Sequence, residues 1–303
     1  MTTAYAYCER LAREHYENFP VASRLLPRRM RPHVAAIYAF ARLADDMADE
    51  GDRPAADRLQ DLRRWRGRLH DAIEGRAAGD GAHGEVFVAL RRTIDDCRLP
   101  VALFDDLISA FEQDVTVTRY ATWKDVLDYC RRSANPVGRL VLRVAGVSDS
   151  ALDEASDAVC TALQLTNFWQ DFEVDWRKGR LYVPTDVWHP LGAREDDLNR
   201  GELTDAWRAA LEEMARRTRA LFDAGRPVCD GVTGRLRWEL RATWLDGTRV
   251  LDKLEARGVD VFRARPALSA SDVPWIVWKM ATWHTARGGA VAASSPADSA
   301  PRN

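Results

Sequence analysis

Apolar residues recur at spacings of three and four along nearly the whole chain, which is the pattern of amphipathic helices. The clearest examples are Asp57–Ile73, Glu85–Asp96, Ala102–Gln113, Trp123–Arg132 and Ala206–Asp223. The alternation of period two that marks strands is confined to brief pieces such as Gly179–Pro184. The pattern therefore predicts an all-α protein with about ten or more helices around one core.

Pro and Gly residues mark breaks between the predicted helices, but none of these breaks reads as a linker between domains. We therefore expect residues 1–286 to form one helical domain. From Arg287 onward the sequence is rich in Gly, Ala, Ser and Pro, a composition that cannot bury apolar surface. Residues 287–303 are predicted to be a disordered C-terminal tail.

The segment His33–Glu50 is apolar over most of its surface, as a buried helix is. One polar stripe is the exception. It carries Tyr38, Arg42, Asp45 and Asp49, with Asp46 and Glu50 beside it. Spacings of four, three and four residues place the first four side chains within roughly 60° of one another on a helix.

A second apolar helix further along the chain repeats this arrangement. Its stripe carries Gln164, Asn167, Asp171 and Asp175. Spacings of three, four and four residues again keep these side chains on one side of the helix. The other sides carry Ala, Val, Leu, Phe and Trp, so the sequence predicts a second carboxylate pair in apolar surroundings.

Carboxylates in apolar surroundings are costly, because each loses its hydration and neighbouring ones repel. Arg42 alone cannot neutralise all of them. Divalent cations can, and Mg²⁺ prefers oxygen ligands, keeps several waters and shares phosphate oxygens. The two stripes together favour a Mg²⁺ site that holds a diphosphate between facing helices. The alternative is that both runs are solvated helix ends paired with nearby arginines.

A basic loop follows the second stripe directly, with Arg177, Lys178 and Arg180 around Gly179. Such a loop can close over a charged ligand, with the cations on phosphate oxygens. The alternative is a basic turn on the surface.

Composition narrows the class of protein. The formal net charge of −2 argues against a general nucleic-acid binder. The five cysteines are odd in number and form no CxxC pair, which fits free thiols in a reducing cytoplasm. No signal-peptide core and no bilayer-length apolar run is found, so we expect a cytoplasmic protein, soluble or peripheral to the inner face of a membrane.

Three motifs occur in this order: Tyr38-x₃-Arg42-x₂-Asp45-Asp46-x₂-Asp49-Glu50, then Gln164-Leu165-Thr166-Asn167-x₃-Asp171-x₃-Asp175, then Lys178-Gly179-Arg180-x-Tyr182-x-Pro184. Together they resemble the squalene/phytoene synthase family, and the similarity runs from Tyr5 to Leu268. The resemblance implies the isoprenoid synthase fold, a single-domain helical bundle with a central active-site cavity. It also implies Mg²⁺ dependence and head-to-head chemistry on prenyl diphosphates.

The resemblance also implies roles for individual residues. The implied metal ligands are Asp45, Asp46, Asp49, Asp171 and Asp175. The implied diphosphate contacts are Arg42, Arg177, Lys178 and Arg180, with His15 as a further contact or an ordinary helix residue. The aromatic side chains expected to face a carbocation are Tyr38, Phe19, Tyr129, Phe168 and Trp169, and Tyr182 belongs to the third motif.

Within the family, the resemblance is closest to the hydroxysqualene synthases of bacterial hopanoid pathways. Two positions depart from the wider family: Asn135 lies in Ala134-Asn135-Pro136-Val137-Gly138, where Ala-Gly-x-Val-Gly is typical, and Gln170 replaces an Arg before Asp171. The implied reaction is presqualene diphosphate plus water to hydroxysqualene plus diphosphate. The amides of Asn135, Gln164, Asn167 and Gln170 are the candidates for positioning the water.

Two other readings remain open. The same fold condenses prenyl diphosphates, such as two farnesyl diphosphates, to presqualene diphosphate, squalene or phytoene. A different class is a non-catalytic helical scaffold. We expect no NADPH, and the GxGxxG match at Gly79–Gly84 has no preceding strand and reads as an interhelix loop.

The candidate partners are a prenyl diphosphate substrate and neighbouring enzymes of the squalene pathway. Trp275 and Trp278 form an apolar stripe near Trp283. Such a stripe is able to dock on a membrane, although we favour core packing for it.

Overall fold

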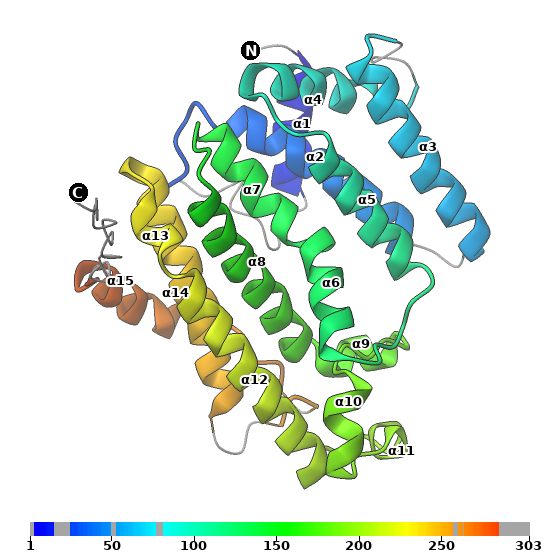
Figure 1. Cartoon of the computed structure of the whole chain (residues 1–303), viewed down its shortest axis with the longest axis vertical. Coiled ribbons are helices and arrows are strands. Elements are labelled where there is room, and N and C mark those ends of the chain that lie inside the picture. Colours follow the sequence, from blue (N-terminus) through cyan, green and yellow to red (C-terminus); the bar gives the residue numbers. More distant parts are fainter. Residues whose placement is uncertain are drawn as a thin grey trace, which may run out of the picture.

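The computed structural model describes residues 3–14, 25–49, 53–76, 81–256, 260–262 and 264–284. The helices are α1 (Thr3–Glu14), α2 (Arg31–Asp49), α3 (Ala55–Ile73), α4 (Gly84–Cys97), α5 (Ala102–Asp114), α6 (Trp123–Ser133), α7 (Asn135–Val144), α8 (Ser150–Gln170), α9 (Phe172–Arg177), α10 (Thr185–Trp188), α11 (Glu195–Asn199), α12 (Asp205–Gly225), α13 (Val228–Gly231), α14 (Gly234–Glu255) and α15 (Val273–Ala281). Figure 1 shows α8 in the middle of the bundle, with α2 to α5 on one side and α12 to α14 on the other.

The all-α prediction is confirmed within these described residues, where the β-structure is one isolated parallel bridge between Arg119 and Leu181. The five helices expected from periodicity all form, with ends within two residues of those expected. The bridge lies in Gly179–Pro184, the segment expected to be extended. The tail predicted from Arg287 lies outside the described residues.

Helix α2 is held by aromatic packing on the face opposite its polar stripe. Phe40 is fully buried, and its ring centroid lies 5.7 Å from that of Trp65 and 5.5 Å from that of Phe104. Residues two apart on a helix point about 200° apart, so Tyr38 and Arg42 face away from this cluster. Packing on α3 and α5 therefore directs the polar stripe of α2 toward the interior of the bundle.

The same logic orients α8. Trp169 lies between Asn167 and Asp171 in sequence, is 1% exposed, and donates a 2.9 Å hydrogen bond from Nε1 to Thr218 Oγ1 on α12. This anchor turns Trp169 away from the second stripe, so it is not among the aromatic side chains that face the cavity described below. The expectation that Trp169 faces a carbocation is wrong for this reason.

A close approach between α8 and α12 depends on the absence of a side chain at Gly225. A methyl group there would lie 2.7 Å from the carbonyl oxygen of Ala155 and 2.8 Å from the backbone nitrogen of Val159. Neither backbone atom moves without shifting α8. We expect Gly225→Ala to lower the free energy of unfolding by about 2 kcal/mol.

Gly67 is the matched control for this prediction. It lies in the exposed part of α3 with no atom within 4 Å of the position of an added methyl group. Since Ala is the better helix former, Gly67→Ala is expected to raise the free energy of unfolding by up to about 1 kcal/mol. Urea denaturation of the two variants measures both changes, and equal signs would contradict the packing argument.

The stripe of Trp275 and Trp278 does not pack in the core. Helix α15 has no buried residue, and Trp278 is 57% exposed. The expectation of core packing is therefore wrong, because α15 lies on the outside of α14 (Figure 1).

Candidate active site

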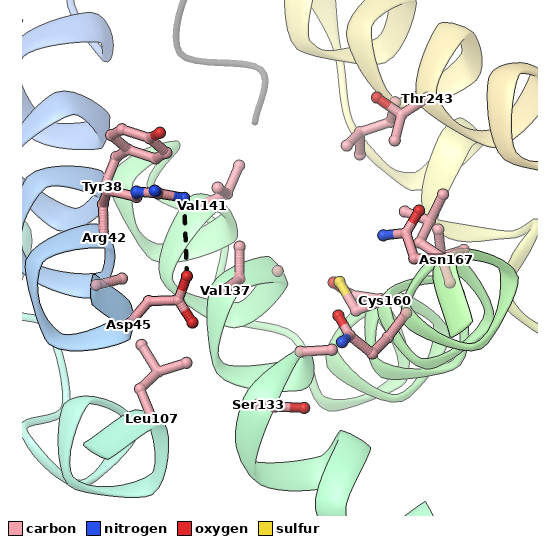
Figure 2. Close-up of a pocket in the computed structure, with 18 of the residues that line it drawn as sticks. Tyr38, Arg42, Asp45, Leu107, Ser133, Val137, Val141, Cys160, Asn167 and Thr243 are labelled. Atoms are coloured by element: carbon pink, nitrogen blue, oxygen red, sulfur yellow. Dashed lines mark ion pairs between the residues drawn. The ribbon is translucent and has the colours of Figure 1, made fainter. Parts of the chain in front are cut away.

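A cavity of about 490 Å³ lies among α2, α5, α6, α7, α8 and α14. Figure 2 shows Tyr38, Arg42 and Asp45 on α2 facing Asn167 on α8 and Thr243 on α14 across this cavity. The structure thus brings the two polar stripes, which are far apart in sequence, to opposite walls of one space.

One end of the cavity is acidic. From α2 it receives Asp45, and from the other wall it receives Asp171 and Asp175. Asp171 ends α8 and Asp175 lies on α9, yet the backbone nitrogen of Asp175 donates a 2.8 Å hydrogen bond to the carbonyl oxygen of Asp171. The helical register therefore continues across the junction and keeps both carboxylates on the cavity side.

The rest of the cavity is largely apolar. Its lining includes Leu26, Val141, Leu142, Val159, Leu163, Val228, Leu236 and Leu240. Most of these belong to one buried cluster between α7, α8 and α13. Val159 precedes Asp171 by twelve residues of helix, about 18 Å along its axis, so the apolar chamber extends well beyond the acidic end.

Two carboxyl groups at the acidic end have raised pKa values. The pKa of Asp45 rises to about 6, chiefly through burial and then through the negative charge of Asp49. The pKa of Asp175 rises to about 7, chiefly through burial and then through the charge of Asp171. The nearby cations do not offset the cost of ionising these two groups, so the acidic end has an affinity for further positive charge.

Arg42 and Asp46 belong to the wall of α2. Nη2 of Arg42 lies 2.8 Å from Oδ1 of Asp46, and Nη1 lies 3.8 Å from Oδ2 of Asp45. Arg42 lines the cavity, whereas Asp46 does not. Asp46 therefore orients the guanidinium of Arg42 from behind, and Glu50 lies outside the described residues.

Two arginines from outside the stripes hold the remaining acids. Arg180 donates to both carboxylate oxygens of Asp49, at 3.2 Å from Nη1 and 2.5 Å from Nη2. Arg265 binds both oxygens of Asp171, with 3.1 Å from Nη2 to Oδ2. Arg180 was expected from its motif, but nothing in the local sequence singled out Arg265.

Asp114 is a further acidic residue that the sequence interpretation missed. It is 9% exposed, accepts a 2.8 Å hydrogen bond from the hydroxyl of Tyr129, and its pKa is raised to about 7, chiefly by burial. Asp45 and Asp49 both act on it electrostatically. Its signal was helical spacing, because Asp114 lies one turn beyond Phe111 and two turns beyond Leu107, both of which line the cavity.

Three predicted aromatic residues stand together on the cavity wall. The rings of Phe168 and Tyr182 are stacked, with centroids 3.6 Å apart and planes within 3°. Tyr129 lies 6.0 Å from Phe168. All three line the cavity, so aromatic faces are available close to the acidic end.

Several predicted residues lie elsewhere. The side-chain oxygen of Asn135 accepts a 2.8 Å hydrogen bond from Thr161, and Gln170 donates to the carbonyl of Pro266. Neither amide lines the cavity, although Gln164 and Asn167 do. Arg177 is 78% exposed and paired with Glu173, and Lys178 is exposed beside it. The remaining two, His15 and Phe19, lie outside the described residues.

The acidic end suits a hard cation shared with a phosphate ligand. Among the described residues, no three His, Cys, Asp or Glu side chains come together in a way that alone holds a metal ion. The donors are carboxylate oxygens on two opposing walls, which is what Mg²⁺ needs when waters and phosphate oxygens complete its coordination. Asp45, Asp171 and Asp175 are the residues that would hold it.

Most of the chain matches known proteins of one family. The family model "Squalene/phytoene synthase" matches residues 12–272. The chain is 37% identical over 243 residues to a hydroxysqualene synthase of Rhodopseudomonas palustris, covering 80% of each chain. It is 40% identical over 209 residues to that of Zymomonas mobilis, covering 68% of this chain and 67% of the relative.

A solved structure gives the same result at the level of the fold. The squalene synthase HpnC from Alicyclobacillus acidocaldarius superposes with a TM-score of 0.76 at 40% identity, covering 83% of this chain and 92% of that one. Since the family model spans most of the chain, and the acidic stripes face one cavity in an all-α bundle, this chain belongs to the squalene/phytoene synthase family of head-to-head prenyl synthases.

Proposed function

We propose that the protein is a hydroxysqualene synthase, which converts presqualene diphosphate and water into hydroxysqualene and diphosphate. The observation that carries this proposal is a single cavity whose acidic end continues into an apolar chamber. Two relatives named hydroxysqualene synthase, at 37% and 40% identity, support the same reaction.

In this proposal the diphosphate group binds at the acidic end. Mg²⁺ held there by Asp45, Asp171 and Asp175 would take up negative charge on the leaving diphosphate. Arg42 lines the same end, and Arg180 and Arg265 place guanidinium groups on the neighbouring carboxylates. Guanidinium binds phosphate oxygens in a bidentate manner, so Arg42 would stabilise the charge that develops as the carbon–oxygen bond breaks, while Arg180 and Arg265 hold Asp49 and Asp171 in place.

The hydrocarbon chains occupy the apolar chamber. Its leucine and valine side chains exclude bulk water, which would otherwise capture the first carbocation before it rearranges. Near the acidic end the stacked pair of Phe168 and Tyr182, with Tyr129 beside it, offers π faces to the cation. The chamber thus protects the rearrangement until one water molecule is admitted.

We assign the positioning of that water to Gln164 and Asn167. Both amides line the cavity between the acidic end and the apolar chamber, and Asn167 lies one helical turn from Asp171. Asn135 and Gln170 are engaged in hydrogen bonds away from the cavity, so they are weaker candidates for this role. Diphosphate has by then departed with the electron pair of the broken carbon–oxygen bond. The water oxygen bonds to the final cation, and its proton passes to the released diphosphate.

Product analysis tests the proposal. Presqualene diphosphate incubated with Mg²⁺ and without NADPH is expected to give the alcohol and diphosphate in equal amounts. A hydrocarbon formed only with NADPH would indicate a squalene synthase instead. Turnover of farnesyl diphosphate alone would indicate the condensing reaction, and turnover of neither substrate would leave a non-catalytic scaffold.

Gln164→Leu is expected to lower the ratio of alcohol to dehydrated hydrocarbon about fivefold to tenfold. The reason is that loss of one hydrogen bond to the quenching water costs about 1 kcal/mol, and loss of a proton from the cation competes with capture by water. Chromatography of the extracted products measures the ratio. Thr243→Val is the matched control, because the hydroxyl of this cavity-lining residue already donates to the backbone carbonyl of Glu239 on its own helix, so its loss should leave the ratio unchanged.

A further inference from the structure

Helix α15 presents a continuous apolar face to solvent. Its exposed positions are Val273, Pro274, Val277, Trp278 and Ala281, here called the docking face. At 100° per residue these positions fall within one arc of roughly 140°. Val273, Val277 and Trp278 are 55%, 59% and 57% exposed, so none of the residues that the structure describes buries this face.

This helix is fixed to the molecule at both ends. At its start, Asp272 is 2% exposed and its two carboxylate oxygens bind Arg249 at 2.8 Å and Lys253 at 2.6 Å on α14. Beyond its end, Trp283 donates a 3.0 Å hydrogen bond to Asp230. The exposure of the docking face is therefore a feature of a rigidly placed helix, not of a segment that has detached from a core.

The charges around the docking face are positive. Lys279 is the only Asp, Glu, Lys or Arg residue within α15, and its ammonium lies 5.1 Å from the ring centroid of Trp278. Arg249 lies over Trp275 at 5.1 Å, and the acid at the helix start is neutralised by its two cations. Exposed Trp beside Lys and Arg, with no free acid among them, is typical of surfaces that bind the interface of an anionic bilayer.

A second exposed aromatic residue extends this surface. Trp238 on α14 is 43% exposed, and Arg241 lies 5.6 Å from its ring and 5.0 Å from that of Trp283. The inner side of α14, through Leu236 and Leu240, lines the apolar chamber. One helix therefore separates the docking face from the chamber.

We propose that the docking face and Trp238 form a binding site for the surface of an anionic phospholipid bilayer. Apolar side chains of this size insert at the boundary of headgroups and acyl chains, while the flanking cations pair with the anionic headgroups. Attachment is peripheral, since none of the described helices combines the length and hydrophobicity that spanning a bilayer requires. The inference rests on the outer surfaces of α14 and α15, and it holds whatever reaction the cavity performs.

Vesicle sedimentation with the full chain tests the proposal. We expect binding to vesicles of phosphatidylcholine mixed with phosphatidylglycerol to be about tenfold stronger than to phosphatidylcholine alone, and to weaken as salt is raised. The double variant Val277→Asp, Trp278→Glu is expected to lose at least about tenfold in binding. Circular dichroism should show an unchanged melting temperature, because both side chains are exposed.

Val88→Asp is the matched control. Val88 is 42% exposed on α4, which lies far from α15 in Figure 1, so the same change of chemistry there should leave vesicle binding unchanged. Failure of the full chain to bind anionic vesicles would overturn the proposal, as would equal binding by the double variant. Light scattering that shows a dimer broken by the double variant, without vesicle binding, would assign the face to a second copy of the chain instead.

Discussion

Asp45→Asn is expected to lower kcat about a thousandfold, whereas Asp46→Asn, one residue along the same helix, is expected to lower it by less than about tenfold. Asp45 lines the acidic end, and burial raises its pKa to about 6, so its carboxylate is the one that a bound cation would neutralise. Loss of one such ligand costs on the order of 4 kcal/mol in the transition state.

The Asp46→Asn variant distinguishes a metal ligand from a residue that only positions Arg42. Asp46 does not line the cavity, and its carboxylate lies 2.8 Å from Arg42. Its replacement therefore loosens Arg42 but leaves the set of metal ligands intact. The measurement is diphosphate release from whichever prenyl diphosphate the wild-type protein consumes, with circular dichroism as the check on folding. Equal losses in the two variants would contradict the assignment of Asp45.

The two acidic stripes were predictable because helical period is a local property. Once α2 and α8 were expected to be helices, spacings of three and four residues fixed which side chains share a face. Because the other faces are apolar, each helix was expected to be buried, and carboxylates on a buried helix need a compensating positive charge. What the sequence left open was how the stripes meet, and the packing of Phe40 and Trp169 on opposite faces decides this in the structure.

The contributions from distant elements were not predictable in the same way. Arg265 reaches Asp171 across 94 residues, and its own neighbourhood carries no periodic signal. Asp114 ends a helix whose other acids are partly exposed, and its spacing from Phe111 becomes informative only once the structure shows that Phe111 lines the cavity. For Asn135 and Gln170 the residue type was suggestive, but the direction of each amide depends on Thr161 and Pro266, which are partners that tertiary packing supplies.

For α15 the sequence predicted an apolar stripe but not whether that stripe is buried or exposed. Its apolar composition favours burial, and the sequence offers no means of telling a core helix from an exposed one at this length. The polar anchors of Asp272 and Trp283 at its two ends settle the matter in the structure, because they fix the helix against α14 with its apolar face outward.

Asp175→Asn is expected to raise the melting temperature of the metal-free protein at pH 8 by about 3 °C and to abolish its stabilisation by Mg²⁺. Burial raises the pKa of Asp175 from 3.8 to about 7. A carboxyl group with a raised folded-state pKa contributes stability below pH 4 that is lost as the pH rises through about 7. At pH 8 the wild-type protein must therefore ionise a disfavoured group, and the neutral amide removes a cost that, discounted for solvent in the cavity, is about 1 kcal/mol.

Asp246→Asn is the control that separates the effect on the metal-free protein from the effect on stabilisation by Mg²⁺. Burial alone raises the pKa of Asp246 to about 6, and this residue does not line the cavity. Asp246→Asn is therefore expected to stabilise the metal-free protein at pH 8 as well, but to keep the rise in melting temperature on addition of Mg²⁺. Because Mg²⁺ binds the ionised carboxylates, that rise should be larger at pH 8 than at pH 6 in the wild-type protein. Melting curves at the two pH values, with and without Mg²⁺, measure each effect. If Asp175→Asn kept the full rise in melting temperature with Mg²⁺, Asp175 would not be a metal ligand. It would then behave as Asp246 does, as a carboxyl group whose ionisation only destabilises the fold.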